Sequence, residues 1–227
     1  MSREYSSGTI KLLYSSPITA KDIILGKFLG MLYYGAILLG ILLVLVLGFA
    51  VTVDNCNYAE LFSGILGIFL LLGAYSAIGL FVSSLTSYQV VAAIGTLVLL
   101  AVLNYANQLW QDIAFVREIT YWICLSGRSG PMTGGLICSE DVIYFLVVIA
   151  MFLSLSILKL QATRQSESKI KTVGKYVALI AGVVVVGYIT SRPVFMYYYD
   201  VTETKRNTLS TGSQEVMANL DGKVTIT

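Results

Sequence analysis

The chain contains no histidine, and only 12% of its 227 residues are charged. Soluble domains carry about 25% charged residues, whereas 56% of this chain is hydrophobic, so the composition is that of a membrane protein. The missing histidine removes the commonest general base and the commonest transition-metal ligand. The sequence also lacks a G-x-x-x-x-G-K-[ST] loop, which would hold nucleotide phosphates. We therefore expect no cofactor, no metal site and no enzymatic activity of the chain itself.

Five apolar segments are expected to be long enough to cross a bilayer core, which takes about 20 helical residues. They are residues 24–51, 61–80, 90–105, 142–158 and 176–189. Their interiors carry no acidic or basic residue, because Lys27 falls in the first turns of an overlong span that would start in the headgroups. Ion-coupled transporters usually need charged residues at membrane depth, so we expect energy to come from a partner. The expected fold class is an all-α integral membrane protein with five transmembrane helices.

The distribution of positive charge predicts the orientation. With the N-terminus inside, nine Lys and Arg residues fall on the inner side, and only Arg117 and Arg128 fall in outer loops before the tail. Cytoplasmic loops carry such an excess of positive charge. We expect a multi-pass protein of the inner (cytoplasmic) membrane with a cytoplasmic N-terminus and an extracytoplasmic C-terminus.

The segment from residue 3 to residue 27 is amphipathic and is interrupted at Pro17. Thr19 with Asp22 three residues later predicts an N-cap, and Pro17 ends the preceding helical turn. The pattern predicts two short helical pieces joined by an elbow at the water boundary. An interfacial helix that only anchors the chain is the alternative.

The residues of this segment also resemble a known motif: Glu4, Gly8-Thr9-Ile10, Leu12-Leu13 and Ser16-Pro17-Ile18-Thr19. They are similar to E-x-x-x-G-T-[IL]-E-L-L-x-x-x-P-[VI]-[ST], from the cytoplasmic coupling segment of type-2 ABC exporter permeases of the gliding-motility-associated branch. In that family the segment docks on a separate ATPase subunit. Lys11 stands where the family usually has an acidic residue. The resemblance implies that the residues coupling the chain to an ATPase are Leu12, Leu13, Ser16, Pro17 and Thr19.

Residues 107–141 combine apolar side chains with Gly127, Gly130-Pro131 and Gly134-Gly135. This mixture predicts a re-entrant outer hairpin of two short helices, with a plain interfacial helix and loop as the alternative. The stretch 134–164 is similar to the family's last permease helix and the hairpin before it. Cys124 and Cys138 could close the hairpin as a disulfide in an oxidising compartment, and free buried thiols are the alternative.

The tail resembles the opening of the auxiliary protein that partners the gliding-type permease, on the residues Asp200-Val201-Thr202 and Lys205-Arg206. The resemblance implies three parts: a permease unit of four spans (1–164), a cytoplasmic linker (165–175), and the first span and truncated extracytoplasmic α/β domain of the auxiliary subunit (176–227). It implies a fragment, with the first two permease helices missing or on a separate chain. We expect a helix capped by Ser210, a strand at 224–226, and loose packing over 202–227.

The function implied is that of a permease subunit of an ATP-driven ABC exporter, which couples a partner ATPase to substrate export or extraction. The expected partners are an ABC ATPase subunit, a second permease copy or missing permease half, and membrane lipid, with no nucleic acid. The alternative is a non-transporting membrane scaffold that anchors an extracytoplasmic domain of a surface or motility complex. Polar residues near the spans, such as Tyr75 and Asn104, are expected to bond helices together rather than to line a path.

Overall fold

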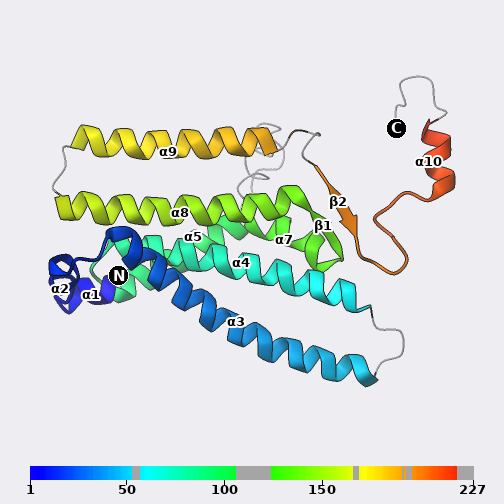
Figure 1. Ribbon diagram of the computed structural model, residues 1–227, viewed down its shortest axis with the longest axis horizontal. Coiled ribbons are helices and arrows are strands. Elements are labelled where there is room, and N and C mark those ends of the chain that lie inside the picture. The colour runs from blue at the N-terminus through cyan, green and yellow to red at the C-terminus, as the bar shows by residue number, and fades with distance from the viewer. Residues whose placement is uncertain (53–56, 106–123, 166–168, 191, 193–195, 219–227) are drawn as a thin grey trace.

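The computed structural model describes residues 1–52, 57–105, 124–165, 169–190, 192 and 196–218. The elements are α1 (Ser2–Ser6), α2 (Ile10–Ser15), α3 (Ala20–Thr52), α4 (Tyr58–Leu85), α5 (Gln89–Tyr105), α7 (Leu125–Thr133), β1 (Leu136–Cys138), α8 (Ser139–Gln165), α9 (Lys169–Thr190), β2 (Tyr198–Asp200) and α10 (Thr211–Ala218). The long helices lie side by side, with α1 and α2 at one end and the strands at the other (Figure 1). We call these the elbow end and the clasp end.

Helices cover all five expected spans. Four of them, α3, α4, α8 and α9, are long and apolar enough to cross a membrane. The fifth, α5, has 17 residues, which is about 26 Å of helix at 1.5 Å per residue, so a fifth crossing stays a prediction. Residues 169–175, which we expected in a linker, form the first turns of α9.

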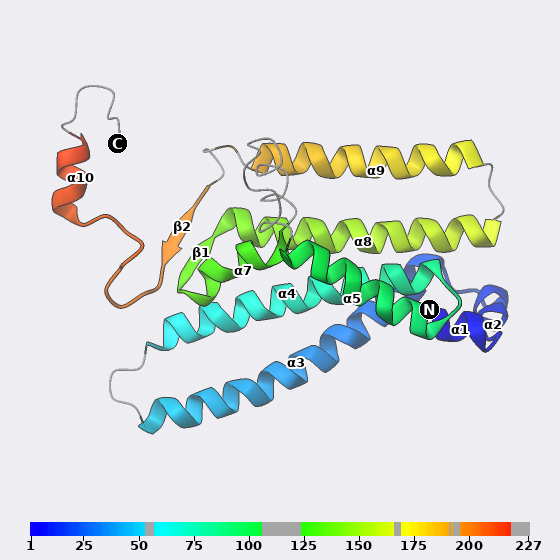
Figure 2. The same cartoon turned by 180° about the vertical axis from the view of Figure 1, so that it is seen from behind.

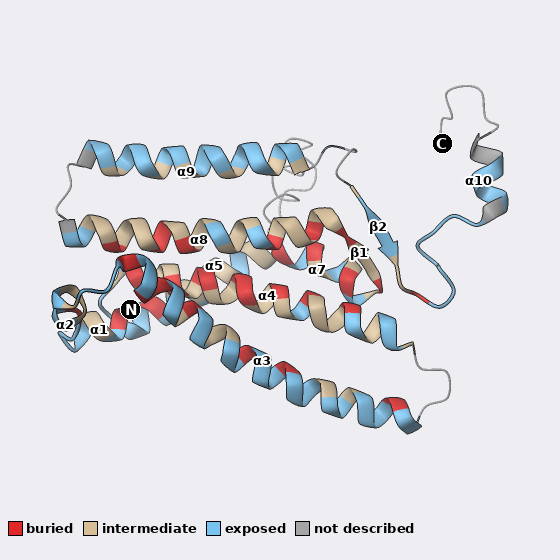
Figure 3. Ribbon diagram, in the orientation of Figure 1, coloured by how far each residue is buried: buried red, intermediate tan, exposed pale blue. Residues whose placement is uncertain are grey.

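Helix α4 lies at the centre of the described bundle. It packs against α3, α5, α7 and α8, and Figure 2 shows α5 crossing it on the back of the molecule. Ala74, Ala77 and Ile78 on α4 are fully buried, and small residues such as the two alanines let helix backbones approach closely in lipid. Helix α9 packs along α8, and none of residues 170–190 is buried (Figure 3). Of the four candidate spans, α9 is therefore the least enclosed.

A buried cluster joins α7 to α4 and α8. Leu125 and Met132 of α7 and Phe145 of α8 are almost completely buried there. A Cβ atom on Gly67 would lie 2.9 Å from the Cβ of Met132, so the missing side chain on α4 allows α7 to approach. Helix α7 falls in the second half of the expected hairpin, and the residues expected to form its first helix lie outside the described ones.

Arg128 of α7 is buried, with 2% of its surface exposed. Its Nη1 donates to Glu140 Oε1 at 3.0 Å and to Asp141 Oδ1 at 3.1 Å, both on the first turn of α8. Its guanidinium carbon also lies 4.6 Å from the ring centroid of Tyr144. Buried charges are kept in proteins where partners of this kind compensate them, so Arg128 fixes α7 against the start of α8.

The clasp consists of β1, β2 and residues 201–206. The strands are antiparallel, with Leu136 opposite Asp200 and Cys138 opposite Tyr198. Gly135 precedes β1 with a φ of +82°, and a Cβ there would lie 2.7 Å from the Thr202 side chain, so glycine is required on both counts. Arg206 donates to Gly134 O and Glu60 Oε1, each at 3.2 Å. The clasp thus ties the tail to α4 and to the turn after α7.

The expected loose packing of the tail is wrong for Thr202. Thr202 is buried, with 6% exposure, and its side chain lies against Gly135. Asp200 Oδ1 accepts hydrogen bonds from the Thr202 amide and hydroxyl at 3.0 and 2.6 Å. Residues 203–210 are exposed. The expected Ser210 cap is confirmed by the Ser213 amide, which donates to Ser210 Oγ at 3.3 Å. The expected strand at 224–226 lies outside the described residues, and an α/β domain stays a prediction.

Candidate functional site

The elbow, residues 2–22, consists of α1, α2 and the turn into α3. Ser16, which precedes Pro17, has an extended backbone with ψ 154°, as steric contact with a following proline requires. Thr19 and Asp22 then form the expected capping box: the Asp22 amide donates to Thr19 Oγ1 at 3.3 Å, and the Thr19 amide donates to Asp22 Oδ2 at 3.1 Å. These contacts satisfy amides at the start of α3 that have no partner within the helix. They fix the beginning of α3 after Pro17, so α2 and α3 are two separate helices.

Arg164, in the last turn of α8, holds the turn around Pro17. Its Nη1 donates to the Ile18 carbonyl at 2.9 Å, and its Nη2 donates to the Tyr14 carbonyl at 3.1 Å and more weakly to the Ser16 carbonyl at 3.5 Å. The carbonyls at the end of a helix lack partners within it. One guanidinium therefore stabilises both sides of the break.

Helix α1 is tied to α3 and α4. Glu4 forms an ion pair with Lys27 of α3, and its Oε2 lies 3.1 Å from the N-terminal ammonium. The Ser2 amide donates to Ser83 Oγ of α4 at 3.0 Å. The hydroxyls of Tyr5 and Tyr14 lie 3.2 Å apart and so join α1 to α2. Together with Arg164, these contacts attach the elbow to three long helices.

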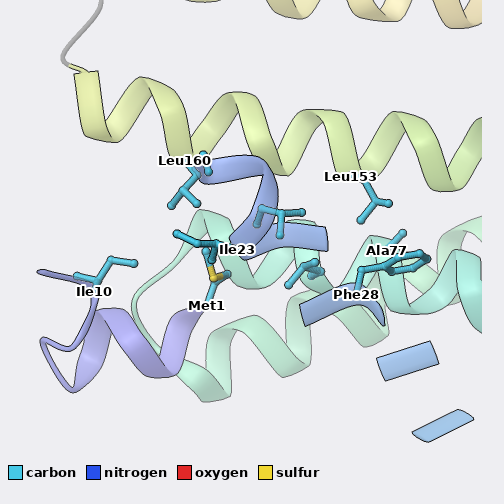
Figure 4. Close-up of a cluster of buried hydrophobic side chains, with 10 residues drawn as sticks. Met1, Ile10, Ile23, Phe28, Ala77, Leu153 and Leu160 are labelled. Carbon is cyan, nitrogen blue, oxygen red and sulfur yellow. The ribbon is translucent and has the colours of Figure 1, made fainter. Parts of the chain in front are cut away.

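An apolar cluster lies beneath the elbow (Figure 4). Ile10 points toward the cluster from α2, and Ile23 and Phe28 enter it from α3. Ala77 of α4 and Leu153 and Leu160 of α8 complete it, as do Met1, Ala20, Ile24 and Leu80. Because Ile10 packs with residues of all three of these long helices, the inner side of the elbow belongs to the core of the bundle.

The structure divides the five predicted coupling residues between two faces. Leu12 is 70% exposed, and Pro17 and Thr19 are also exposed. Leu13 packs against the apolar cluster beneath the elbow, and Ser16 Oγ donates to the Leu13 carbonyl at 2.9 Å. Only the first three are thus fully open to a partner, beside Ile18, which is 42% exposed.

The sequence indicated no role for Arg164 or Lys27 other than as two of the basic residues on the inner side of the membrane. Glu4 and Lys27 are 23 residues apart, and Arg164 is 146 residues from Ile18. No local spacing rule reaches over such separations. The position of Arg164 at the end of the last permease span was a weak indication of its role. Basic side chains at the C-terminal end of a helix often donate hydrogen bonds to backbone carbonyls that lack a partner.

The Glu4 contact gives a prediction that pH can test. Burial alone would raise the pKa of Glu4, but hydrogen bonds from Lys27 and the N-terminal ammonium outweigh it and lower this pKa from 4.5 to about 2. A depressed folded pKa contributes stability above the unfolded pKa and loses it as pH falls through the folded value. Attachment of α1 should therefore persist above about pH 4.5 and weaken towards about pH 2.

A spin label at Ser6, introduced as Ser6→Cys in a chain without its native cysteines, measures this attachment through its mobility. Glu4→Gln should give the mobile spectrum already at neutral pH. Glu203→Gln, in the exposed tail, serves as the control for loss of a carboxylate. An immobile label in the Glu4→Gln chain would contradict the assignment of the ion pair as the tether.

Cys124 and Cys138 lie towards the clasp end, Cys124 directly before α7 and Cys138 at the end of β1. Both are free and buried in the structure. The structure therefore contains no disulfide between them and has the free buried thiols that were the alternative. Cys56 lies outside the described residues. Burial is the main cause that raises the pKa of Cys138 to about 11. Since the thiolate is the reactive form, Cys138 should react slowly in the resting chain.

Among the polar residues near the spans, Tyr75 and Asn104 meet as expected. The Tyr75 hydroxyl donates to Asn104 Oδ1 at 2.8 Å and so joins α4 to α5. This contact bonds two helices together and is the role favoured by the sequence.

Comparison with known proteins gives one family. The profile of the family described as "ABC-2 family transporter protein" matches residues 1–120, which is more than half of the 227 residues. The matched range contains the whole elbow, α3, α4 and α5. No curated protein and no solved structure matches the chain.

Proposed function

The chain belongs to the ABC-2 family of transporter membrane proteins, and from this premise we propose that it is the permease subunit of an ATP-driven exporter whose elbow receives the movement of a separate ATPase subunit. The observation that carries the proposal is the position of Leu12. It is 70% exposed on α2, whose Ile10 is buried in a cluster with residues of α3, α4 and α8 and whose Tyr14 carbonyl accepts from Arg164 of α8. The outer face of such a helix can bind a partner, and its inner face is attached to the long helices. Movement of the partner is therefore passed to the bundle.

The chemistry of the surface fits a protein partner. Leu12 and Ile18 are large exposed apolar side chains in a polar segment, and Lys11 beside them is exposed as well. Apolar anchors surrounded by polar residues are typical of protein interfaces. We place this surface in the cytoplasm, with the C-terminus on the opposite side, in agreement with the distribution of positive charge.

The finer assignments extend the same proposal. Residues 1–164 act as the permease unit and pair with a second copy or with a missing permease half, in contact with membrane lipid. Residues 176–227 comprise a first span and the opening of an extracytoplasmic domain, both related to the auxiliary subunit of the gliding-motility branch. The motif at the elbow and the residues of the tail support these assignments, and no enzymatic activity of the chain itself is proposed.

Purification from native membranes tests the proposal. The tagged chain is extracted in mild detergent and irradiated with a photoreactive azido-ATP. We expect one co-purifying subunit to be labelled and to yield a tryptic peptide with a G-x-x-x-x-G-K-[ST] loop. If no nucleotide-labelled subunit accompanies the chain, the exporter assignment is wrong.

A non-transporting scaffold remains the second candidate. The clasp favours this function because the clasp fixes the tail to the bundle, as a scaffold that anchors an extracytoplasmic domain requires. The two functions differ in ATP turnover. An exporter requires that the hydrolysis rate of the ATPase depend on this subunit, whereas a scaffold leaves that rate unchanged when the subunit is removed.

A further inference from the structure

Helix α8 is bonded to the elbow through its last turn. Arg164 donates to carbonyls on both sides of Pro17. A guanidinium presents its donors in a rigid planar fork, so it can hold several carbonyls in one arrangement. Displacement of the elbow is therefore applied directly to the end of α8.

The opposite end of α8 is joined to the clasp without an intervening loop. Strand β1 ends at Cys138, and α8 begins at Ser139. The Ser139 amide donates to the Tyr197 carbonyl at 3.0 Å, and Ser139 Oγ accepts from the Tyr197 amide at 2.9 Å. The first residue of α8 is thus bonded to the chain just before β2.

Between its ends, α8 is an unbroken helix of 27 residues, about 40 Å long at 1.5 Å per residue. It contains neither glycine nor proline, which are common causes of sharp kinks. Phe145, Leu153 and Leu160 are buried along it. A helix of this kind transmits a displacement along its length as one unit.

Val201 is hydrogen-bonded both to the residue before β1 and to the N-cap residue of α4. Its amide donates at 2.9 Å to the carbonyl of Gly135, which precedes β1 and α8. Its carbonyl accepts at 2.8 Å from Asn57 Nδ2, and Asn57 is the N-cap of α4. Movement of α8 relative to α4 changes the separation of these two anchors and disturbs the clasp.

We propose that α8 is a mechanical link that carries movement of the elbow to the clasp, so that the chain delivers the work of the ATPase to the segment after β2 as well as to the bundle. Arg164 is the positioning residue at one end of the link, and the pairing of β1 with β2 is the element that responds at the other. This proposal rests on the proposed docking of an ATPase at the elbow.

The reactivity of Cys138 measures the response of the clasp. Cys138 lies opposite Tyr198 in the strand pair and is 8% exposed, so opening of the pair increases its alkylation by a maleimide. The chain is used in complex with its co-purified ATPase in lipid nanodiscs, with Cys56→Ser and Cys124→Ala. We expect MgATP to raise the alkylation rate about fivefold or more, the lower end of typical coupling between sites.

Arg164→Met should remove this dependence on ATP while the ATPase still binds, and Arg164→Lys should restore part of it because an ammonium can donate to the same carbonyls. Lys175→Met removes a positive charge from an exposed residue of α9, outside the elbow and the clasp, and should leave the response unchanged. The link is overturned if an ATPase that binds and hydrolyses ATP does not alter the alkylation rate, or if Arg164→Met keeps the response. Failure of the ATPase to co-purify would instead overturn the proposed function.

Discussion

Leu12→Glu is expected to weaken binding of the ATPase subunit by about thirtyfold, which corresponds to about 2 kcal/mol, the loss typical of a central interface residue. Leu12 is 70% exposed in the free chain, so the substitution changes the outer surface of α2 and leaves the apolar cluster beneath it intact. In the complex, the carboxylate would have to be buried against an apolar pocket without a partner. Titration of the purified ATPase against the chain in nanodiscs measures the affinity.

The matched control is Leu209→Glu. Leu209 is 60% exposed in the tail, so the same substitution at the other end of the molecule should leave the affinity unchanged. Leu13→Glu is a poor substitute, because Leu13 packs against the buried cluster and a charge there would disturb the elbow itself. Wild-type affinity of the Leu12→Glu chain would show that the ATPase does not dock on this surface.

The features of the fold that the sequence predicted depend on neighbours along the chain. The capping box needs only Thr19 and Asp22, three residues apart, and the break needs only Pro17. The long helices follow from apolar runs that must satisfy their backbone hydrogen bonds internally in lipid. Such features were identified correctly because a few adjacent residues determine them.

The features that the sequence did not predict depend on distant parts of the chain. Whether Leu12 or Leu13 faces outward is decided by the surface against which α2 packs, and that surface comes from α3, α4 and α8. The bond from Arg164 to Ile18 joins residues 146 positions apart. The clasp pairs two strands of only three residues each, too short to be recognised by alternation of polar and apolar residues.

The largest effect on stability is expected at Arg128, which the sequence marked only as one of two basic residues in an outer loop. Arg128→Met should lower the free energy of unfolding by about 3–5 kcal/mol, because removal of one partner from a buried ion pair leaves the other charge uncompensated. The charges left behind are Glu140, with 19% of its side chain exposed, and Asp141, with 9%. Equilibrium unfolding in mixed micelles with increasing SDS measures the change.

Two comparisons separate the charge effect from simple loss of packing. Arg206→Met removes an arginine whose side chain is 60% exposed and paired with Glu60 at the same end of the molecule, and it should cost no more than about 1 kcal/mol, as exposed ion pairs do. Addition of Glu140→Gln and Asp141→Asn to Arg128→Met removes both carboxylates and should recover much of the lost stability. If the triple variant is no more stable than Arg128→Met alone, Arg128 stabilises the clasp end through its packing against Tyr144 rather than through charge.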